Sequence, residues 1–158
     1  MNNSSSFLLI KNGNLFDPRE RGQKDILIGE GRIIKIEERI NAPRCVNTET
    51  LDASGKYIVP GLIDLHVHLI GGGGESGPYS RVPEIPISEI AEAGITTVVG
   101  TLGTDDVTRD VESLLAKAQG LNHHVTSYIY TGSYHVPSPT ITDSVKHDIA
   151  LIDEIIGV

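Results

Sequence analysis

The sequence predicts an α/β fold in which a small β-rich domain precedes the first strands of a parallel sheet. Two observations predict it. Short apolar runs separated by Gly and Asn turns fill the first third of the chain, whereas apolar strands alternate with helical patterns from Tyr57 onwards. We therefore expect residues 1–56 to form the N-terminal part of a small β-sandwich domain and residues 57–158 to form an α/β domain.

The first domain is predicted from short apolar runs with alternating faces. The expected strands are Phe7–Lys11, Asn14–Phe16, Asp25–Ile28 and Arg32–Ile36. The expected breaks between them are Asn12-Gly13, Asp17-Pro18 and Gly29-Glu30-Gly31. The segment Asp52–Lys56, of sequence DASGK, is the expected domain boundary.

The second domain is predicted from alternating strand and helix patterns, which are typical of parallel sheets. The expected strands are Ile58–His68, Ile95–Thr101 and Val125–Thr131. A short helix is expected at Ser88–Ala93, capped by Ser88 and ended by Gly94. An amphipathic helix is expected at Asp110–Asn122. A third helix is expected to start at Asp143 or Ser144 and to run through Ile149 and Ile152 to Ile155 or Ile156.

Two histidines at the end of the first of these strands form a candidate metal site. Side chains alternate along a strand, so His66 and His68 point to the same side while Val67 points to the other. Two imidazoles that share a face can ligate one metal ion. A structural pair of histidines is the alternative, but the Pro-Gly entry before the strand and the four glycines after it favour the metal site.

Composition excludes several classes of function. The 158 residues carry a net charge of −8, so no basic cluster is available to neutralise nucleic-acid phosphates. Cys45 is the only cysteine, which excludes a disulfide framework within the chain. The first residues lack the basic segment of a signal peptide, and no apolar run approaches the roughly 20 residues of a membrane helix. We expect a cytoplasmic protein without membrane contacts.

Four segments resemble one family closely. The strand PGLIDLHVH resembles the amidohydrolase superfamily. The strings HVHLIGGGGE, VVGTLGTD and TGSYHVPS resemble, more narrowly, the isoaspartyl dipeptidase family. The likeness extends from about Leu8 to Val158, and the glycine-rich string is far more specific than the two histidines alone.

The resemblance implies a (β/α)₈ metal-dependent hydrolase barrel, of which this chain holds the N-terminal part, preceded by the β-sandwich domain. It implies two zinc ions at the carboxyl ends of the strands, with His66 and His68 as ligands of one metal. A carbamylated lysine expected just after Val158 would bridge the ions, and two histidines and an aspartate would follow it. We therefore expect the chain to be incomplete. The family also assembles into homo-oligomers.

The resemblance also implies roles for loop residues. Glu75 would hold the α-ammonium group of the substrate, with Gly73 offering a backbone contact. Thr104 would contact the substrate too, although a threonine before an aspartate also caps turns. Tyr134 would be catalytic and would bind substrate, polarising the scissile carbonyl. Asp64 is equally interpretable as a group that orients an imidazole and as a polar strand residue. His135 is expected to be a loop residue or a residue that supports the site from behind the ligands, and the remaining histidines are expected at the surface: His123, His124 and His147.

The activity implied is hydrolysis of the β-aspartyl amide bond of short peptides, chiefly dipeptides with an N-terminal isoaspartate, by a metal-bridging hydroxide. Three alternatives remain open. The protein could act on cyclic amides like a hydantoinase or dihydroorotase. It could be a scaffold without metals, although such proteins typically lose the histidines. It could also be a free-standing binding module, but the open strand edges of a partial barrel disfavour this.

Overall fold

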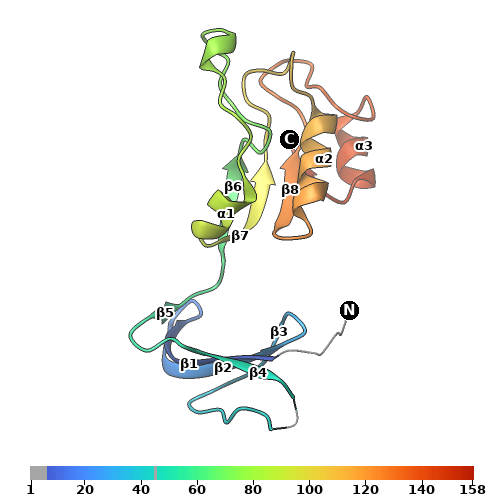
Figure 1. The fold of residues 1–158 in the computed structure, drawn as a ribbon. Helices are drawn as coiled ribbons and strands as arrows, with labels where there is room; N and C mark the ends of the chain where they lie inside the picture. The colour runs from blue at the N-terminus through green and yellow to red at the C-terminus, as the bar shows by residue number, and fades with distance from the viewer. Residues whose placement is uncertain (1–6, 45) are drawn as a thin grey trace. The chain divides into compact units, whose positions relative to one another are not determined.

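The computed structural model describes residues 7–44 and 46–158, and the chain divides into two compact units, Met1–Pro60 and Gly61–Val158 (Figure 1). The predictions made for Cys45 and for the first six residues lie outside the described residues. Both units contain sheets and the second contains helices, so the mixed α/β class is confirmed.

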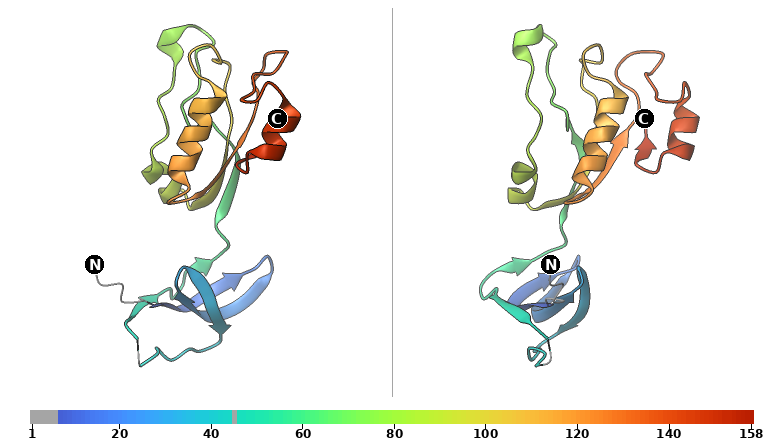
Figure 2. Two further views of the ribbon diagram at one scale, coloured as in Figure 1. Left: turned by 90° about the vertical axis from the view of Figure 1, so that its right-hand side faces the viewer. Right: turned by 45° about the vertical axis from the view of Figure 1, so that its right-hand side comes forward.

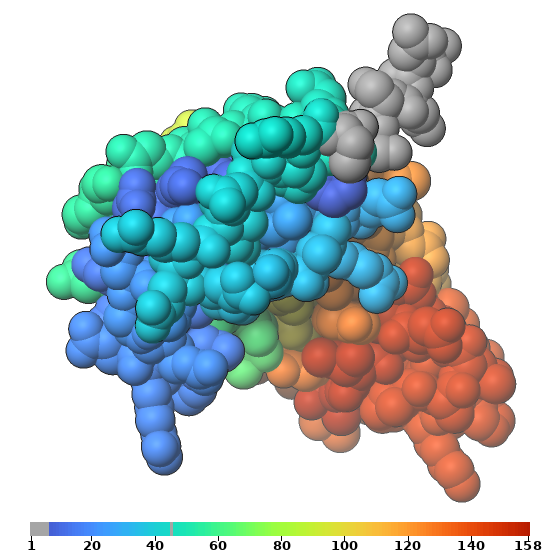
Figure 3. All heavy atoms as spheres, turned by 90° about the horizontal axis from the view of Figure 1, so that it is seen from below, coloured from blue at the N-terminus to red at the C-terminus, as the bar shows by residue number. Residues whose placement is uncertain are grey.

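The N-terminal unit contains a five-stranded sheet in the order β3-β2-β1-β4, with β5 also pairing with β1. Its strands are β1 (Phe7–Phe16), β2 (Glu20–Gly29), β3 (Arg32–Glu37), β4 (Thr48–Asp52) and β5 (Tyr57–Ile58). The pairs β1–β2 and β2–β3 are antiparallel, whereas β4 and β5 run parallel to β1. Figure 3 shows the atoms of these strands, in blue and cyan, packed closely together.

A buried carboxylate supports an irregularity in β1. The predicted break at Asn12-Gly13 is a bulge within one continuous strand, with Asn12 at a positive φ of 61°. Asp25, only 1% exposed, accepts hydrogen bonds from the backbone N–H groups of Asn12 (2.9 Å) and Ile40 (2.8 Å). Lys11 lies 3.4 Å from the same carboxylate. These contacts satisfy a charge that would otherwise be costly to bury.

Two expectations for this unit differ from the structure. Strand β4 was not predicted, because Thr48–Asp52 has only one large apolar residue, Leu51, and that side chain is 52% exposed. The predicted sandwich would need two facing sheets. The described part of this unit forms one sheet, whose small core contains Leu9, Leu27 and Ile40.

The C-terminal unit contains a four-stranded parallel sheet in the order β6-β7-β8-β9. Its elements are β6 (Leu62–Val67), η1 (Pro78–Ser80), α1 (Ile87–Glu92), β7 (Ile95–Gly100), α2 (Val111–Leu121), β8 (Thr126–Tyr130), α3 (Val145–Leu151) and β9 (Ile155–Gly157). Along the chain, each helix follows one strand of the sheet and precedes the next. The helices and the sheet bury one apolar cluster that includes Leu69, Val98, Leu114 and Ile129.

The prediction of one continuous strand over Ile58–His68 is wrong. Ile58 pairs with Leu15 in the N-terminal sheet, and β6 begins only at Leu62. Pro60 between them has no N–H to donate to a sheet, which explains the interruption. At Gly61 a Cβ would lie 2.1 Å from the Thr96 hydroxyl, so the chain approaches β7 too closely for a larger residue.

The helices follow the sequence prediction more closely. Asp110 caps α2 by accepting a hydrogen bond from the Ser113 N–H at 2.7 Å. Gly94 follows α1 with a φ of 72°, as expected of a residue that ends a helix. Ser88, however, lies inside α1, whose first flanking residue is Pro86.

The last helix is shorter than predicted. Ser144 caps α3, which ends at Leu151, and Ile155 lies in β9 instead of the helix. Ile155 is 2% exposed and belongs to the core. Its spacing fits a helical period, but it is buried as part of strand β9.

The four parallel strands place their carboxyl ends at one edge of the sheet. Figures 1 and 2 show long loops leaving β6, β7 and β8 at this edge. None of the helices in the described residues is long and apolar enough to cross a membrane.

Candidate active site

The two predicted ligand histidines lie side by side at the carboxyl end of β6. Their ring centroids are 5.3 Å apart and the rings meet edge to face. The strand ends at Val67, which is buried, and a register irregularity lies between Asp64 and Val67. The two rings therefore adjoin at the strand end, although each histidine lines a different cavity.

His68 is held between two backbone segments. A Cβ on Gly72 would lie 2.9 Å from the His68 ring, and a Cβ on Gly103 would lie 3.4 Å from it. The Nδ1 atom lies 3.2 Å from the Thr101 carbonyl oxygen and donates to it. That hydrogen bond leaves Nε2 with its lone pair free, which is the arrangement of a histidine that ligates a metal.

Asp64 does not orient an imidazole. Its Oδ1 accepts a hydrogen bond from the backbone N–H of His66 at 3.0 Å. Of the two interpretations offered by the sequence, the structure supports the local polar role.

Glu75 and Thr104 come together beside His68. The pKa of Glu75 lies below its ordinary value, first because the carboxylate accepts a hydrogen bond from its own backbone N–H. A hydrogen bond from the Thr104 side chain lowers it further, whereas burial raises it in part. Glu75 is therefore an ionised acceptor, which suits it to an ammonium group.

The glycine-rich loop before Glu75 has a conformation that other residues would not adopt. Gly73 has a φ of 70°, and a Cβ there would lie 2.3 Å from the Ser80 carbonyl oxygen. The Ser80 hydroxyl accepts hydrogen bonds from the N–H groups of Gly74 (3.2 Å) and Ser76 (3.3 Å), on either side of Glu75. Hydrogen bonds and close backbone contacts therefore define the conformation of this loop.

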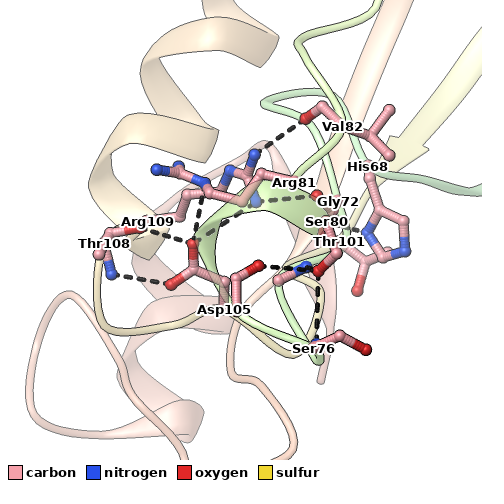
Figure 4. A network of polar contacts seen from close by, with 12 residues as sticks. His68, Gly72, Ser76, Ser80, Arg81, Val82, Thr101, Asp105, Thr108 and Arg109 are labelled. Carbon is pink, nitrogen blue, oxygen red and sulfur yellow. Dashed lines mark hydrogen bonds and ion pairs between the residues drawn. The ribbon is translucent and has the colours of Figure 1, made fainter.

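Arg109 supports the same loop and was not singled out from the sequence. Its side chain is 8% exposed and donates to the carbonyl oxygens of Gly72 (3.1 Å) and Val82 (2.9 Å) (Figure 4). Asp105 lies 3.6 Å from Arg109 and 3.4 Å from Arg81. The four-residue spacing of Asp105 and Arg109 was the available signal, but nothing local indicates that the guanidinium reaches back to Gly72.

Tyr134 lies in the segment after β8. It lines a cavity of about 290 Å³ together with His66, Thr101, Thr131 and Val158. The side chain itself is 72% exposed. The structure thus brings Tyr134 and His66 to the same cavity, whereas His68 lines a separate one with Gly72 and Val82.

Asp106 holds the segment that carries Tyr134 and was also missed. Its Oδ2 accepts hydrogen bonds from the Ser133 hydroxyl and from Nδ1 of His135. His135 is an exposed loop residue, as predicted, and His123, His124 and His147 are exposed too. The pKa of Asp106 is lowered, chiefly by the Ser133 hydrogen bond.

Comparisons with known proteins agree with this geometry. A crystal structure of beta-aspartyl dipeptidase from Fervidobacterium islandicum AW-1, in complex with a beta-Asp-Leu dipeptide, is 46% identical with a TM-score of 0.90. It is matched over 98% of this chain and 40% of its own. The predicted resemblance to the isoaspartyl dipeptidase family is confirmed.

Other amidohydrolases match less completely. The dihydroorotase of Streptococcus pneumoniae serotype 4 is 38% identical over 71% of this chain, and this chain spans 26% of that relative. A dihydroorotase crystal structure, at 22% identity and a TM-score of 0.59, shows a shared fold alone. No family model matches the sequence.

The donors in the described residues suit at most one metal ion and do not complete its coordination. Within residues 7–44 and 46–158, no group of three or more His, Cys, Asp or Glu side chains could hold a metal ion. His66 and His68 are the pair suited to one ion, because their rings adjoin and Nε2 of His68 is free. Further ligands are needed to complete the coordination.

Proposed function

We propose that this protein hydrolyses the β-aspartyl amide bond of short peptides with an N-terminal isoaspartate. The observation that carries the proposal is that the adjoining histidines with Glu75, then Thr104, then Tyr134 follow the carboxyl ends of β6, β7 and β8 in turn, and that His66 and Tyr134 line one cavity. The 46% identity to a beta-aspartyl dipeptidase crystallised with beta-Asp-Leu supports it. The parallel sheet would form the first part of a (β/α)₈ barrel, and the N-terminal sheet would form part of a β-sandwich.

Glu75 would read the α-ammonium group of the substrate. The ionised carboxylate is a charge-assisted acceptor, and the glycine loop holds it through the contacts of Ser80. Gly73 would offer its backbone to the same ligand, since the absence of a side chain permits close approach. Thr104 would orient Glu75 and contact the substrate beside it. An α-linked peptide would place its ammonium group differently and leave the carboxylate unpaired.

His66 and His68 would hold a zinc ion through their imidazole nitrogens. Zinc ions, when bound, supply a nucleophile by making water acidic enough to ionise near neutral pH. Tyr134 would donate its phenolic hydrogen to the carbonyl oxygen of the scissile amide, where negative charge develops. Thr101 would keep His68 in the tautomer that binds metal through Nε2.

Hydrolysis of cyclic amides is the second candidate. It is favoured by the 38% identity to a dihydroorotase over 71% of this chain. A cyclic amide carries no free α-ammonium group, so it would make no use of Glu75. Glu75 therefore separates the two candidates.

The decisive experiment compares three substrates with the intact, zinc-loaded protein: β-Asp-Leu, α-Asp-Leu and dihydroorotate. We expect hydrolysis of β-Asp-Leu alone, its abolition in His68→Ala, and a roughly hundredfold lower kcat/KM in Glu75→Gln. Glu112→Gln, which changes an exposed carboxylate on α2, is the matched control and should leave kcat/KM unchanged. Hydrolysis of dihydroorotate alone, unaffected by Glu75→Gln, would refute the dipeptidase proposal.

The remaining expectations stay predictions. They are a cytoplasmic location, a homo-oligomeric assembly, and the absence of nucleic-acid and membrane partners. Size-exclusion chromatography with light scattering measures the assembly directly.

A further inference from the structure

Asp106 contacts both neighbours of the proposed catalytic tyrosine. The carboxylate lies in the loop between β7 and α2, with its side chain 5% exposed. It accepts hydrogen bonds from the Ser133 hydroxyl and the His135 ring, which precede and follow Tyr134. The backbone N–H of His135 also donates to the Ser133 hydroxyl oxygen at 3.1 Å. Tyr134 therefore lies at the tip of a short turn closed on both sides by one carboxylate.

Within the part of the protein that the structure describes, Tyr134 is 72% exposed, so few contacts of the phenol itself hold it there. The backbone on one side is constrained by Gly132, which has a φ of 90° and approaches Val158 and Ser138 closely. The backbone after Tyr134 is constrained by His135, which donates to Asp106 through its ring and to the Ser133 hydroxyl through its backbone N–H. The backbone turn that carries Tyr134 therefore sets the region that its hydroxyl can reach.

The same loop connects the two halves of the site. Thr104, which adjoins Glu75, lies two residues before Asp106. The neighbouring Asp105 accepts from Thr108 and lies beside Arg109, which donates to Gly72 of the glycine loop. Adjacent carboxylates thus support different loops, Asp105 on the Glu75 side and Asp106 on the Tyr134 side.

From these contacts we infer that Asp106 is a positioning residue that sets where Tyr134 stands relative to Thr104 and His66. The inference rests on the proposed function, in which Tyr134 polarises the scissile carbonyl. Loss of Asp106 would leave the substrate-binding groups in place and displace the phenol, so kcat should fall while KM changes little.

The test compares Asp106→Leu, which removes both acceptors, with Asp106→Asn, which keeps an oxygen able to accept from Ser133 and His135. Asp110→Asn is the matched control, since Asp110 caps α2 four residues away and does not contact this turn. Kinetics with β-Asp-Leu are measured for each variant in the intact zinc-loaded enzyme. Amide hydrogen exchange is followed in residues 132–138 and 71–77.

We expect Asp106→Leu to lower kcat at least tenfold with KM changed less than threefold, and Asp106→Asn to retain most of the activity. Exchange should rise in residues 132–138 and not in residues 71–77. The double variant Asp106→Leu/Tyr134→Phe should be no slower than Tyr134→Phe, because both changes remove the same interaction. Asp110→Asn should show neither effect.

Three results would overturn the inference: unchanged exchange in residues 132–138, unchanged kcat in Asp106→Leu, or full additivity in the double variant. Failure of the wild-type enzyme to cleave β-Asp-Leu would instead overturn the proposed function. In that case the exchange measurement still decides whether Asp106 holds the turn.

Discussion

The two loops that flank the histidine pair are held in opposite ways. The glycine loop is tied through its backbone, because Arg109 donates to carbonyl oxygens and Ser80 accepts from N–H groups. The Tyr134 turn is tied mainly through side chains, because Asp106 accepts from Ser133 and His135. The Arg109 guanidinium holds the glycine loop, and the Asp106 carboxylate holds the Tyr134 turn.

The difference follows from what each loop presents. The glycine loop presents backbone groups and the Glu75 carboxylate to a ligand. Because its glycines carry no side chains, its carbonyl oxygens are bound by a donor from outside the loop, Arg109. The Tyr134 segment presents an exposed side chain, and its neighbours supply the groups that a carboxylate can bind. The far end of that segment has a second support, since Asp148 accepts hydrogen bonds from Thr131, Ile141 and Thr142.

The largest effect should come from removing that second support. Asp148 is fully buried and accepts four hydrogen bonds, so Asp148→Ala leaves the N–H groups of Ile141 and Thr142 unpaired. We expect the free energy of unfolding to fall by about 4 kcal/mol. Chemical denaturation measures it, with the exposed Asp153→Ala as control. A loss below about 1 kcal/mol would mean that the Tyr134 segment does not depend on this anchor.

The glycine loop should break at Gly73. The Cβ of Gly73→Ala would meet the Ser80 carbonyl at 2.3 Å, so the loop must move and carry Glu75 with it. We expect kcat/KM for β-Asp-Leu to fall about a hundredfold, or roughly 2.7 kcal/mol. Gly22→Ala is the matched control, because Gly22 has the same φ of 70° but no atom within 4 Å of its Cβ. Equal effects of the two substitutions would show that backbone strain alone is responsible.

Acidification should lower the free energy of unfolding, because protonation of Asp148 weakens its hydrogen bonds to the segment that follows β8. Burial raises the pKa of Asp148, but the hydrogen bonds from Thr131, Thr142 and the Ile141 backbone outweigh it and hold the pKa below the ordinary 3.8. A lowered pKa in the folded state stabilises the protein above the unfolded pKa, and this stability is lost as pH falls below about 4. Unfolding free energies measured between pH 6 and pH 3 should therefore fall less steeply in Asp148→Ala. Parallel curves would contradict this assignment.

Local patterns predicted the elements that depend on local interactions. Helix α2 begins after Asp110 and ends at Leu121 as expected, because the cap and the apolar period lie within the helix itself. The positive φ of Gly94 and the adjoining rings of His66 and His68 were predictable for the same reason. Family-specific strings added Glu75, Thr104 and Tyr134, which the fold brings to the same edge of the sheet.

Long-range partners decided the rest. Whether Ile58 continues into β6 depended on its pairing with Leu15, and whether Ile155 joined a helix or a strand depended on the core that buries it. The sequence by itself determined helix α2 and the adjoining histidine pair, and through the family resemblance it supplied the candidate residues around the pair. Only the tertiary structure decided which carboxylates and which guanidinium hold the loops, because a charged side chain can bind many partners and the fold selects those that lie within reach of it.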